Sequence, residues 1–233
     1  MQSAGEVVSS IRRVLRRAGG FRPRLDLHCD TSRLGTEYGG WTLATKSLSR
    51  EDVVYSFGVG EDISFDQQLI DKFGVTVHAF DPTPRSIDWV ERQSLPARFV
   101  FHAYGLAAID GDITFSPPDD PAHVSYTVLA RPSTKSVAVA LPVRRLATIA
   151  HELGHQVIDV LKMDIEGAEY QVINDILSSG IYPRQLLVEF HHFLPGVSAR
   201  KTRQALGTLR AAGYRLFFVS QSGDEYSLLR EQD

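Results

Sequence analysis

The sequence predicts an α/β domain built on a doubly wound, mostly parallel seven-stranded sheet with one antiparallel strand near the C-terminus. Three observations support this fold. From about residue 50, short β-rich runs alternate with amphipathic helical stretches. Helical segments separate the first five strands, which are therefore expected to run parallel. Only a tight turn at Ser222–Gly223 separates the last two, so one of these is antiparallel. We expect a Rossmann-like sheet with helices on both faces.

The elements follow one another with recognisable boundaries. Runs rich in β-branched, aromatic and leucine residues predict strands at 53–59, 75–80, 97–104, 158–163, 186–190, 214–220 and 225–230. Apolar residues three and four positions apart predict helices at about 65–73, 84–95, 142–153, 168–179 and 198–212. The third of these helices is expected to begin at Pro142. Gly74 is placed to end a helix as a left-handed cap, Gly154 to cap another at its C-terminus, and Gly180 to close a third.

Two segments lie outside this alternation. Residues 116–135 hold four of the 11 prolines, which predicts a loop or hairpin excursion after a turn at Asp110–Gly111. Residues 1–45 are expected to form an N-terminal helix and cap segment, and residues 46–233 the α/β domain. The helix, near residues 7–17, carries arginines beside an apolar face. It either docks on the domain with its arginines in water or contacts an anionic surface or substrate.

Composition excludes several classes of function. With 28 acidic and 25 basic residues, the net charge of −3 gives no global footprint for nucleic acid. No stretch approaches the ~18 apolar residues of a membrane-spanning helix, so a soluble protein is expected. The single cysteine, Cys29, excludes an internal disulfide framework and favours a reducing, cytoplasmic setting. The oligomeric state is not indicated.

The letters HELGH at 151–155 match a zinc-protease helix motif, in which two histidines share a helix face. Gly154 is expected to cap the helix, which would leave His155 outside it. The third metal ligand is also missing: the metzincin pattern needs glycine and histidine where this chain has Ile158 and Leu161, and the thermolysin type needs glutamate where it has Asp175. A zinc hydrolase is therefore an unfavoured alternative, and we assign no metal ligands. A divalent metal that bridges Asp164, Glu189 and a histidine stays open, because the residue types alone do not establish it.

The turn after the first strand has the character of a nucleotide site. Gly58 and Gly60 allow tight turning and close approach of the backbone to a ligand. Asp81 follows the second strand, about 20 residues later, where an acidic side chain accepts hydrogen bonds from an adenosine ribose. Two structural glycines and a surface aspartate are the plain alternative. The flanking strands favour a binding site.

The ligand at this turn is not expected to be a dinucleotide. Ile63 replaces the third glycine of that fingerprint, and Glu61 and Asp62 occupy the first turn of the helix. Each carboxylate would repel a pyrophosphate charge at roughly 5 Å by about 3 kcal/mol at an effective dielectric constant of about 20. A cationic adenosine compound without phosphates, such as S-adenosylmethionine, fits better.

Four stretches in order carry a family resemblance: VVYSFGVGEDISFD, VHAFDPTP, LKMDIEGAEY and LLVEFHHF. Together with YGGW at 38–41 and HVSYT at 123–127, they resemble the FkbM-type methyltransferases, most closely their methyltransferase-like branch. The resemblance covers nearly all of the chain after residue 35, and LKMDIEGAEY is its most specific part. It implies a class I fold and S-adenosylmethionine as cofactor.

The resemblance also implies cofactor contacts by position: Gly58 and Gly60 along the cofactor, Asp81 at the ribose, Gly105 and Leu106 near the adenine, and Asp164 at the methionine part or the transferring methyl group. Many family members have aspartate where this chain has Ser56, which puts the contact expected there in doubt. Glu61 or Asp62 is a candidate to replace it.

Candidate acid–base groups follow the fourth and fifth strands. The set comprises Asp164, Glu166, Glu189, His191 and His192. We predict that all of them except Glu166 are catalytic residues, and an imidazole has the pKa best matched to neutral pH. We expect His191 or His192 to be the general base and Glu189 to orient it or the substrate. The alternative is a histidine pair that packs under a loop.

The predicted function is S-adenosylmethionine-dependent methylation of a hydroxyl on a small molecule or sugar, as the resemblance implies. N-methylation stays open. A rival from another class is a cofactor-binding module that lacks catalysis.

Overall fold

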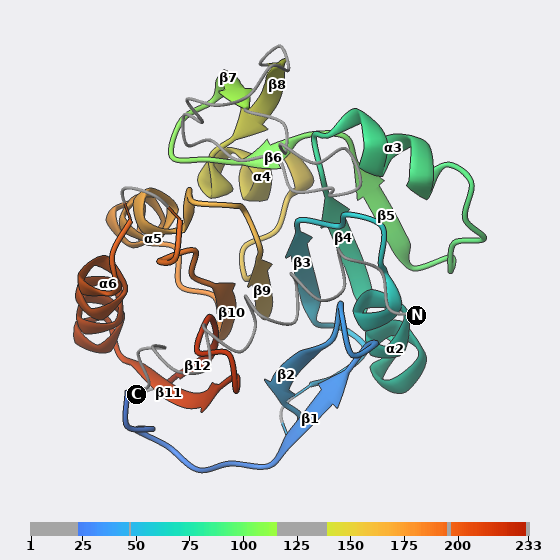
Figure 1. Cartoon of the computed structure of the whole chain (residues 1–233). Coiled ribbons are helices and arrows are strands. Elements are labelled where there is room, and N and C mark those ends of the chain that lie inside the picture. Colours follow the sequence, from blue (N-terminus) through green and yellow to red (C-terminus); the bar gives the residue numbers. More distant parts are fainter. Residues whose placement is uncertain (1–22, 47, 116–138, 195–196, 232–233) are drawn as a thin grey trace, which may run out of the picture.

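The computed structural model describes residues 23–46, 48–115, 139–194 and 197–231 (Figure 1). The helix predicted near residues 7–17 and the excursion predicted at 116–135, including HVSYT, lie outside these residues. A seven-stranded sheet has the order β11-β12-β10-β9-β3-β4-β5. Its strands, in chain order, are β3 (Val53–Phe57), β4 (Thr76–Phe80), β5 (Phe99–His102), β9 (Val160–Met163), β10 (Gln185–Glu189), β11 (Tyr214–Val219) and β12 (Glu225–Arg230).

The strand directions confirm the predicted topology. Neighbours among β5, β4, β3, β9 and β10 all pair in parallel, whereas β12 runs antiparallel to both β10 and β11. The chain order reverses between β3 and β9, since β4 and β5 extend one way and β10 the other. In such sheets, ligands bind past the carboxyl ends of the strands at this reversal.

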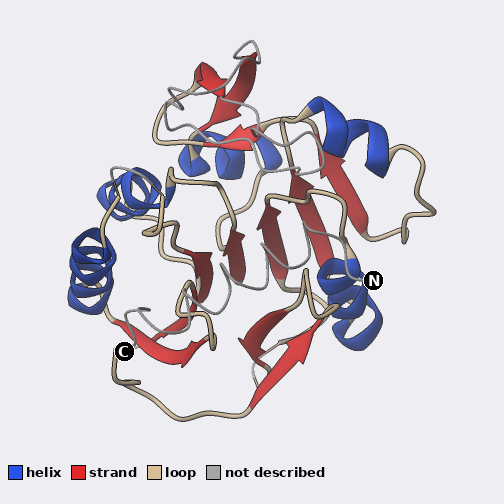
Figure 2. Ribbon diagram, viewed as in Figure 1, coloured by secondary structure: helices blue, strands red, loops and turns tan. Residues whose placement is uncertain are grey.

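Helices cover both faces of the sheet (Figure 2). The five described helices are α2 (Ser64–Phe73), α3 (Pro84–Val90), α4 (Leu146–Leu153), α5 (Glu169–Ser178) and α6 (Ala199–Ala211). One hydrophobic core joins the sheet to α4, α5 and α6, and a second joins it to α2 and α3. Alternate strand residues serve the two cores: Tyr55 and Phe57 belong to the first and Val54 to the second.

Left-handed glycines end two helices as predicted. Gly74 follows α2 with a φ of 68°, and Gly154 follows α4 with a φ of 73°. Residues other than glycine, asparagine or aspartate rarely adopt this conformation, which is why glycine is favoured there. The cap at Gly154 places His155 outside the helix that carries His151.

The prediction that Pro142 opens a helix is wrong. Pro142 lies in β8 (Val139–Arg144), which pairs antiparallel with β7 (Gly111–Phe115), and α4 begins only at Leu146. On its other side β8 pairs with the short β6 (Gly105–Leu106), at Val143 and Arg144 only. Proline is tolerated in this strand because no partner strand needs its missing N–H.

A hairpin of β1 (Thr31–Leu34) and β2 (Trp41–Ala44) precedes the sheet and was not expected. It is anchored by side chains from distant strands. Gln185 exchanges two 2.9 Å hydrogen bonds with the backbone of Ala44, and the Ser227 hydroxyl donates to the carbonyl of Thr42 at 2.6 Å. The division between residues 45 and 46 stays a prediction.

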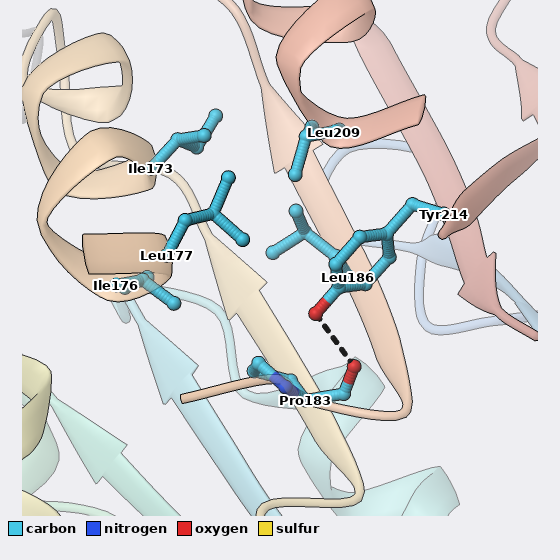
Figure 3. Close-up of a pocket in the computed structure, with 7 residues that line it drawn as sticks. All are labelled: Ile173, Ile176, Leu177, Pro183, Leu186, Leu209 and Tyr214. Carbon is cyan, nitrogen blue, oxygen red and sulfur yellow. Dashed lines mark hydrogen bonds between the residues drawn. The ribbon is translucent and has the colours of Figure 1, made fainter. Parts of the chain in front are cut away.

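A small apolar pocket lies between α5, α6 and the sheet (Figure 3). It is lined by Ile173, Ile176, Leu177, Pro183, Leu186, Leu209 and Tyr214. The Tyr214 hydroxyl donates to the carbonyl of Pro183 at 2.9 Å, so this polar group is satisfied within the protein. We interpret the pocket as a packing feature. In the part of the chain that the structure describes, none of the helices combines the length and apolar character needed to cross a membrane.

Candidate active site

The glycine turn after β3 is packed against the residues that follow β9 and β4. Gly58 has a φ of 82°, and a Cβ atom added to it would lie 2.0 Å from the backbone oxygen of Asp164. Gly60 has a φ of 58°, and its N–H donates to Oδ2 of Asp81 at 3.0 Å. Only glycine permits so close an approach at position 58. The turn is therefore built to bring three strand ends together.

Asp81 occupies the predicted position at the end of β4. Its side chain is 5% exposed, and Oδ1 accepts hydrogen bonds from the backbone N–H of Thr83 at 2.9 Å and from its hydroxyl at 2.6 Å. A carboxylate oxygen can accept two hydrogen bonds, so Oδ2 keeps a second acceptor position beside the one that Gly60 occupies. The predicted ribose contact is compatible with this arrangement and stays a prediction.

Lys162 binds the backbone of the glycine turn, a role that was not predicted from the sequence. This buried lysine donates to the carbonyl of Phe57 at 3.1 Å and to that of Gly58 at 2.7 Å. Its ammonium also lies 5.4 Å from the ring centroid of Trp41. The signal was available, since a lysine in the middle of the apolar run 158–163 needs buried acceptors.

Ser56 and Asp66 lie on the same side of the sheet as Lys162. Ser56 is fully buried and offers no exposed surface to a ligand. Burial raises the pKa of Asp66 to about 6, although the charge of Lys162 and the Ser56 hydroxyl oppose the shift. The contact that the resemblance places at position 56 stays doubtful.

Glu61 and Asp62 both have partners within the protein. Arg85 donates to the two carboxylate oxygens of Glu61, each at 2.9 Å. Asp62 accepts from the Thr36 hydroxyl at 2.6 Å and from the N–H of Ser64 at 2.7 Å. Because Arg85 compensates Glu61, the charge argument against a phosphate ligand is weaker than the sequence suggested. A cofactor contact of either carboxylate stays a prediction.

Four carboxylates surround His191 at the ends of β9 and β10, and we call this group the acidic cluster: Asp164, Glu166, Glu169, Glu189 and His191. His191 is 3% exposed, and its Nδ1 lies 2.7 Å from Oε1 of Glu169. Its Nε2 lies 3.4 Å from Glu166, 3.7 Å from Asp164 and 3.9 Å from Glu189. Glu166 has a φ of 51°, the one positive φ of a non-glycine residue in the described part of the chain.

Burial and neighbouring charges raise the pKa values of three groups in the acidic cluster. Burial disfavours the imidazolium of His191, but the charge and hydrogen bond of Glu169, with Glu166 and Glu189, outweigh burial and raise the pKa of His191 well above its usual value. Burial, followed by the charge of Asp164, raises the pKa of Glu189 well above its usual value. Burial also raises the pKa of Asp164. So many carboxylates in one place favour a cationic occupant.

The structure brings together three of the predicted catalytic residues: Asp164, Glu189 and His191. The group at hydrogen-bond distance from His191 is Glu169, rather than the expected Glu189. Sequence reasoning missed Glu169 because its place in the first turn of α5 is typical of a surface carboxylate, yet it is fully buried. His192 is half-buried, with its ring 6.2 Å from that of Phe193.

Gly105 and Leu106, expected near the adenine, form β6 beside the loop after β4. A Cβ on Gly105 would lie 3.0 Å from the ring of Pro82, and Leu106 is 3% exposed in the first core. Tyr38 lies in the turn between β1 and β2. Its surroundings, followed by the charges of Asp164 and Glu189, raise its pKa, although the side chain is 77% exposed.

The two histidines of HELGH do not share one helix, because Gly154 ends α4 between them. His155 lies beyond the helix, and its Nδ1 is 2.8 Å from the Tyr55 hydroxyl. The rings of His78 and His102 stack there, with His78 Nδ1 3.1 Å from His102 Nε2. We call His78, His102, His155 and Tyr55 the histidine stack. Among the described residues, the group close enough to share a metal ion is a different one: Asp164, Glu166 and His191.

Comparison with known proteins decides the family. The family model of the methyltransferase FkbM domain matches residues 47–216. The chain belongs to the FkbM methyltransferase family. It is 25% identical over 204 residues to probable methyltransferase-like protein 24 of Rattus norvegicus and 28% identical over 158 residues to the Homo sapiens protein of that name. These alignments cover 82% and 67% of this chain but 49% and 37% of the relatives, so the chain spans at most about half their length.

A solved structure supports the same fold. The methyltransferase FkbM of Methylobacillus flagellatus KT matches with a TM-score of 0.50 at 14% identity, over 78% of this chain and 44% of that one. The resemblance inferred from the sequence is confirmed, as is the Rossmann-like methyltransferase fold.

Proposed function

We propose that this FkbM-family chain transfers a methyl group from S-adenosylmethionine to a hydroxyl of a small molecule or sugar. The observation that carries the proposal is the convergence of the Gly58–Gly60 turn, Asp81 and the acidic cluster at the carboxyl ends of β3, β4, β9 and β10. That edge, at the reversal of strand order, is where this class of sheet binds ligands. We also propose a reducing, cytoplasmic setting, which fits the single cysteine.

The chain's own residues fit the cofactor. Gly58 lets the turn pack against the backbone of Asp164, which brings the turn beside the acidic cluster, and Asp81 offers an acceptor for a ribose hydroxyl. The carboxylates of Asp164 and Glu189 complement a sulfonium and an ammonium group. When bound, S-adenosylmethionine supplies a methyl group that the acceptor oxygen takes as the carbon–sulfur electron pair leaves with sulfur.

The protein's task is to position the acceptor and remove its proton. Holding an acceptor oxygen and the methyl carbon about 3–3.5 Å apart can supply roughly 7–11 kcal/mol. We propose that an imidazole at the end of β10, of His191 or His192, accepts the hydroxyl proton and that Asp164 and Glu189 hold the reacting groups. The raised pKa of His191 disfavours its neutral form, so His192 is the better candidate of the two. Glu169 fixes the ring of His191 by its 2.7 Å contact with Nδ1.

Calorimetric titration with S-adenosylmethionine and with S-adenosylhomocysteine tests the proposal. We expect both to bind, and Asp81→Asn to weaken binding at least 10-fold, because an amide is a poorer acceptor than a carboxylate and donates a hydrogen itself. Asp88→Asn on α3, whose side chain is 66% exposed, is the matched control and should bind like the unchanged protein. Lack of affinity for both compounds would overturn the proposal.

The acceptor class needs a separate measurement. Incubation with methyl-labelled S-adenosylmethionine and a panel of sugars, other hydroxyl compounds and amines should label the hydroxyl compounds. Labelling of amines alone would exclude O-methylation. Cofactor binding without transfer to any member of the panel would favour a binding module.

A further inference from the structure

A second ligand position lies inside the acidic cluster. We propose that Asp164, Glu166 and His191 bind one divalent cation of the Mn²⁺ or Mg²⁺ class. Each of the three offers one ligand atom, and these atoms all lie within 4.8 Å of one another. Ligands on neighbouring corners of an octahedron, each at about 2.2 Å from an ion, lie about 3.1 Å apart, and ligands on opposite corners about 4.4 Å. The distances of 3.4 Å and 3.7 Å from His191 Nε2 to the two carboxylates are within this range.

Burial supplies an observation that is independent of the grouping. The side chain of His191 is 3% exposed, and its Nε2 points at the carboxylates rather than at solvent. Oδ1 of Asp164 is shielded from solvent and accepts no hydrogen bond within the described part of the chain. A buried carboxylate oxygen without a donor is costly, and a cation at this position would satisfy it.

Glu169 completes the arrangement expected of a metal-binding histidine. Histidine ligands commonly donate their second ring N–H to a carboxylate, which fixes the tautomer and leaves the other nitrogen for the metal. His191 Nδ1 stands 2.7 Å from Glu169 Oε1, which leaves Nε2 as the ligand atom. Two carboxylate oxygens and one imidazole nitrogen suit Mn²⁺, and carboxylates alone also suit Mg²⁺.

The role of the ion in methyl transfer rests on the proposed function, whereas the binding of the ion to these three residues does not depend on it. A cation beside Asp164 would polarise an acceptor hydroxyl and lower its pKa. With His191 Nε2 committed to the ion, the proton acceptor among the predicted residues becomes His192 or Glu189. His191 then positions the ion and takes no proton.

Mn²⁺ binding to the purified full chain tests this inference without any acceptor. Electron paramagnetic resonance titration should show one tightly bound Mn²⁺ per chain. Glu166→Gln should weaken binding at least 10-fold, and Asp164→Asn should do the same. Glu51→Gln, at an exposed carboxylate in the turn before β3, is the control and should bind like the unchanged protein. Circular dichroism shows whether each variant is folded.

Absence of a bound Mn²⁺, or equal binding by the unchanged protein and a folded Glu166→Gln variant, would overturn the inference. Titration of the same samples with S-adenosylmethionine keeps the two proposals apart. Cofactor binding without Mn²⁺ binding removes only the ion. Mn²⁺ binding without cofactor binding removes the proposed function and leaves the metal site.

Discussion

The acidic cluster and the histidine stack use the same residue type in opposite ways. In the acidic cluster, carboxylates raise the pKa of His191 well above its usual value, despite burial. In the stack, burial, followed by the neighbouring His155 and His102, lowers the pKa of His78 to about 4. The first histidine is held by charge at the ends of β9 and β10, and the second by aromatic packing within the sheet. His102, for example, stacks on Phe80 with ring centroids 4.6 Å apart.

The contrast shows that the partners of a histidine, more than its burial, determine its chemistry. Both clusters lie on the sheet, and the buried imidazole of His191, rather than the half-buried ring of His78, is the one whose pKa is raised. The acidic cluster places charge where a ligand can reach it, since Asp164 remains 31% exposed on its side chain. The histidine stack keeps its rings neutral and contributes to stability. Four substitutions would break or sharpen this comparison.

Glu169→Leu is expected to have the largest effect. It leaves His191 buried beside three carboxylates without its hydrogen-bond partner, and breaking a buried charged pair costs about 3–5 kcal/mol. Urea unfolding at pH 7 should show this loss in the free energy of unfolding. Glu169→Gln keeps an acceptor for Nδ1 and should lose clearly less. Equal stability of Glu169→Leu and the unchanged protein would show that the pair is not needed for folding.

Lys162→Met should have the next largest effect, on ligand binding. It removes the ammonium that holds the carbonyls of Phe57 and Gly58 and that lies near the acidic cluster. We expect calorimetry to show affinity for S-adenosylmethionine lowered about 10- to 100-fold, which corresponds to about 1.4–2.8 kcal/mol. Lys72→Met, on the exposed side of α2, serves as control. Unchanged affinity in a folded Lys162→Met variant would show that the glycine turn keeps its conformation without the Lys162 ammonium.

The sequence was informative where local rules decide the structure. The alternation of β-rich runs with helical stretches predicted all seven strands of the main sheet. Gly74 and Gly154 were predicted to cap helices, and both do so in the left-handed conformation. It failed where distant residues decide. The pairing of β7 with β8 overrides the preference of Pro142 for the start of a helix. This could not be predicted from residues near Pro142, because the partner strand lies more than 20 residues earlier in the chain.

The candidate site shows the same division. Asp164, Glu189 and His191 could be predicted because they follow strands whose carboxyl ends share one edge. The partner of His191 could not be predicted, since Glu169 lies on the next helix and its burial depends on how α5 packs on the sheet. The ion pair of Arg85 with Glu61 likewise joins α3 to the glycine turn, which only the fold brings together.

Lowering the pH should reduce the free energy of unfolding through the histidine stack. The native pKa of His78, about 4, lies below its usual 6.5, so between these values the unfolded chain binds a proton that the native chain does not. The contribution of His78 to the free energy of unfolding is therefore fully present above about pH 6.5 and is lost as the pH falls towards 4. Allowing for partial solvent screening, we expect His78 to account for about 1–2 kcal/mol.

The groups that face His78 are His102, His155 and Tyr55, with the cation of Arg144 beyond His102. All of these oppose a proton on His78 or are neutral. His78→Leu should flatten the dependence of the free energy of unfolding on pH between 6.5 and 4, measured by urea unfolding at several pH values. An equally steep dependence in the variant would assign the effect to other groups.

His155→Phe should have the smallest effect, and it also tests the HELGH coincidence. The phenyl ring keeps the edge contact with His78 but loses the hydrogen bond to the Tyr55 hydroxyl, which leaves a partly buried hydroxyl without that partner. Such a loss costs about 1 kcal/mol, which thermal unfolding can resolve. Zinc content and S-adenosylmethionine affinity should stay unchanged, because His155 lies outside α4 and among aromatic rings rather than carboxylates. A stoichiometric loss of zinc on this substitution would mean that His151 and His155 meet at a metal after all, and that the histidine stack is a ligand site.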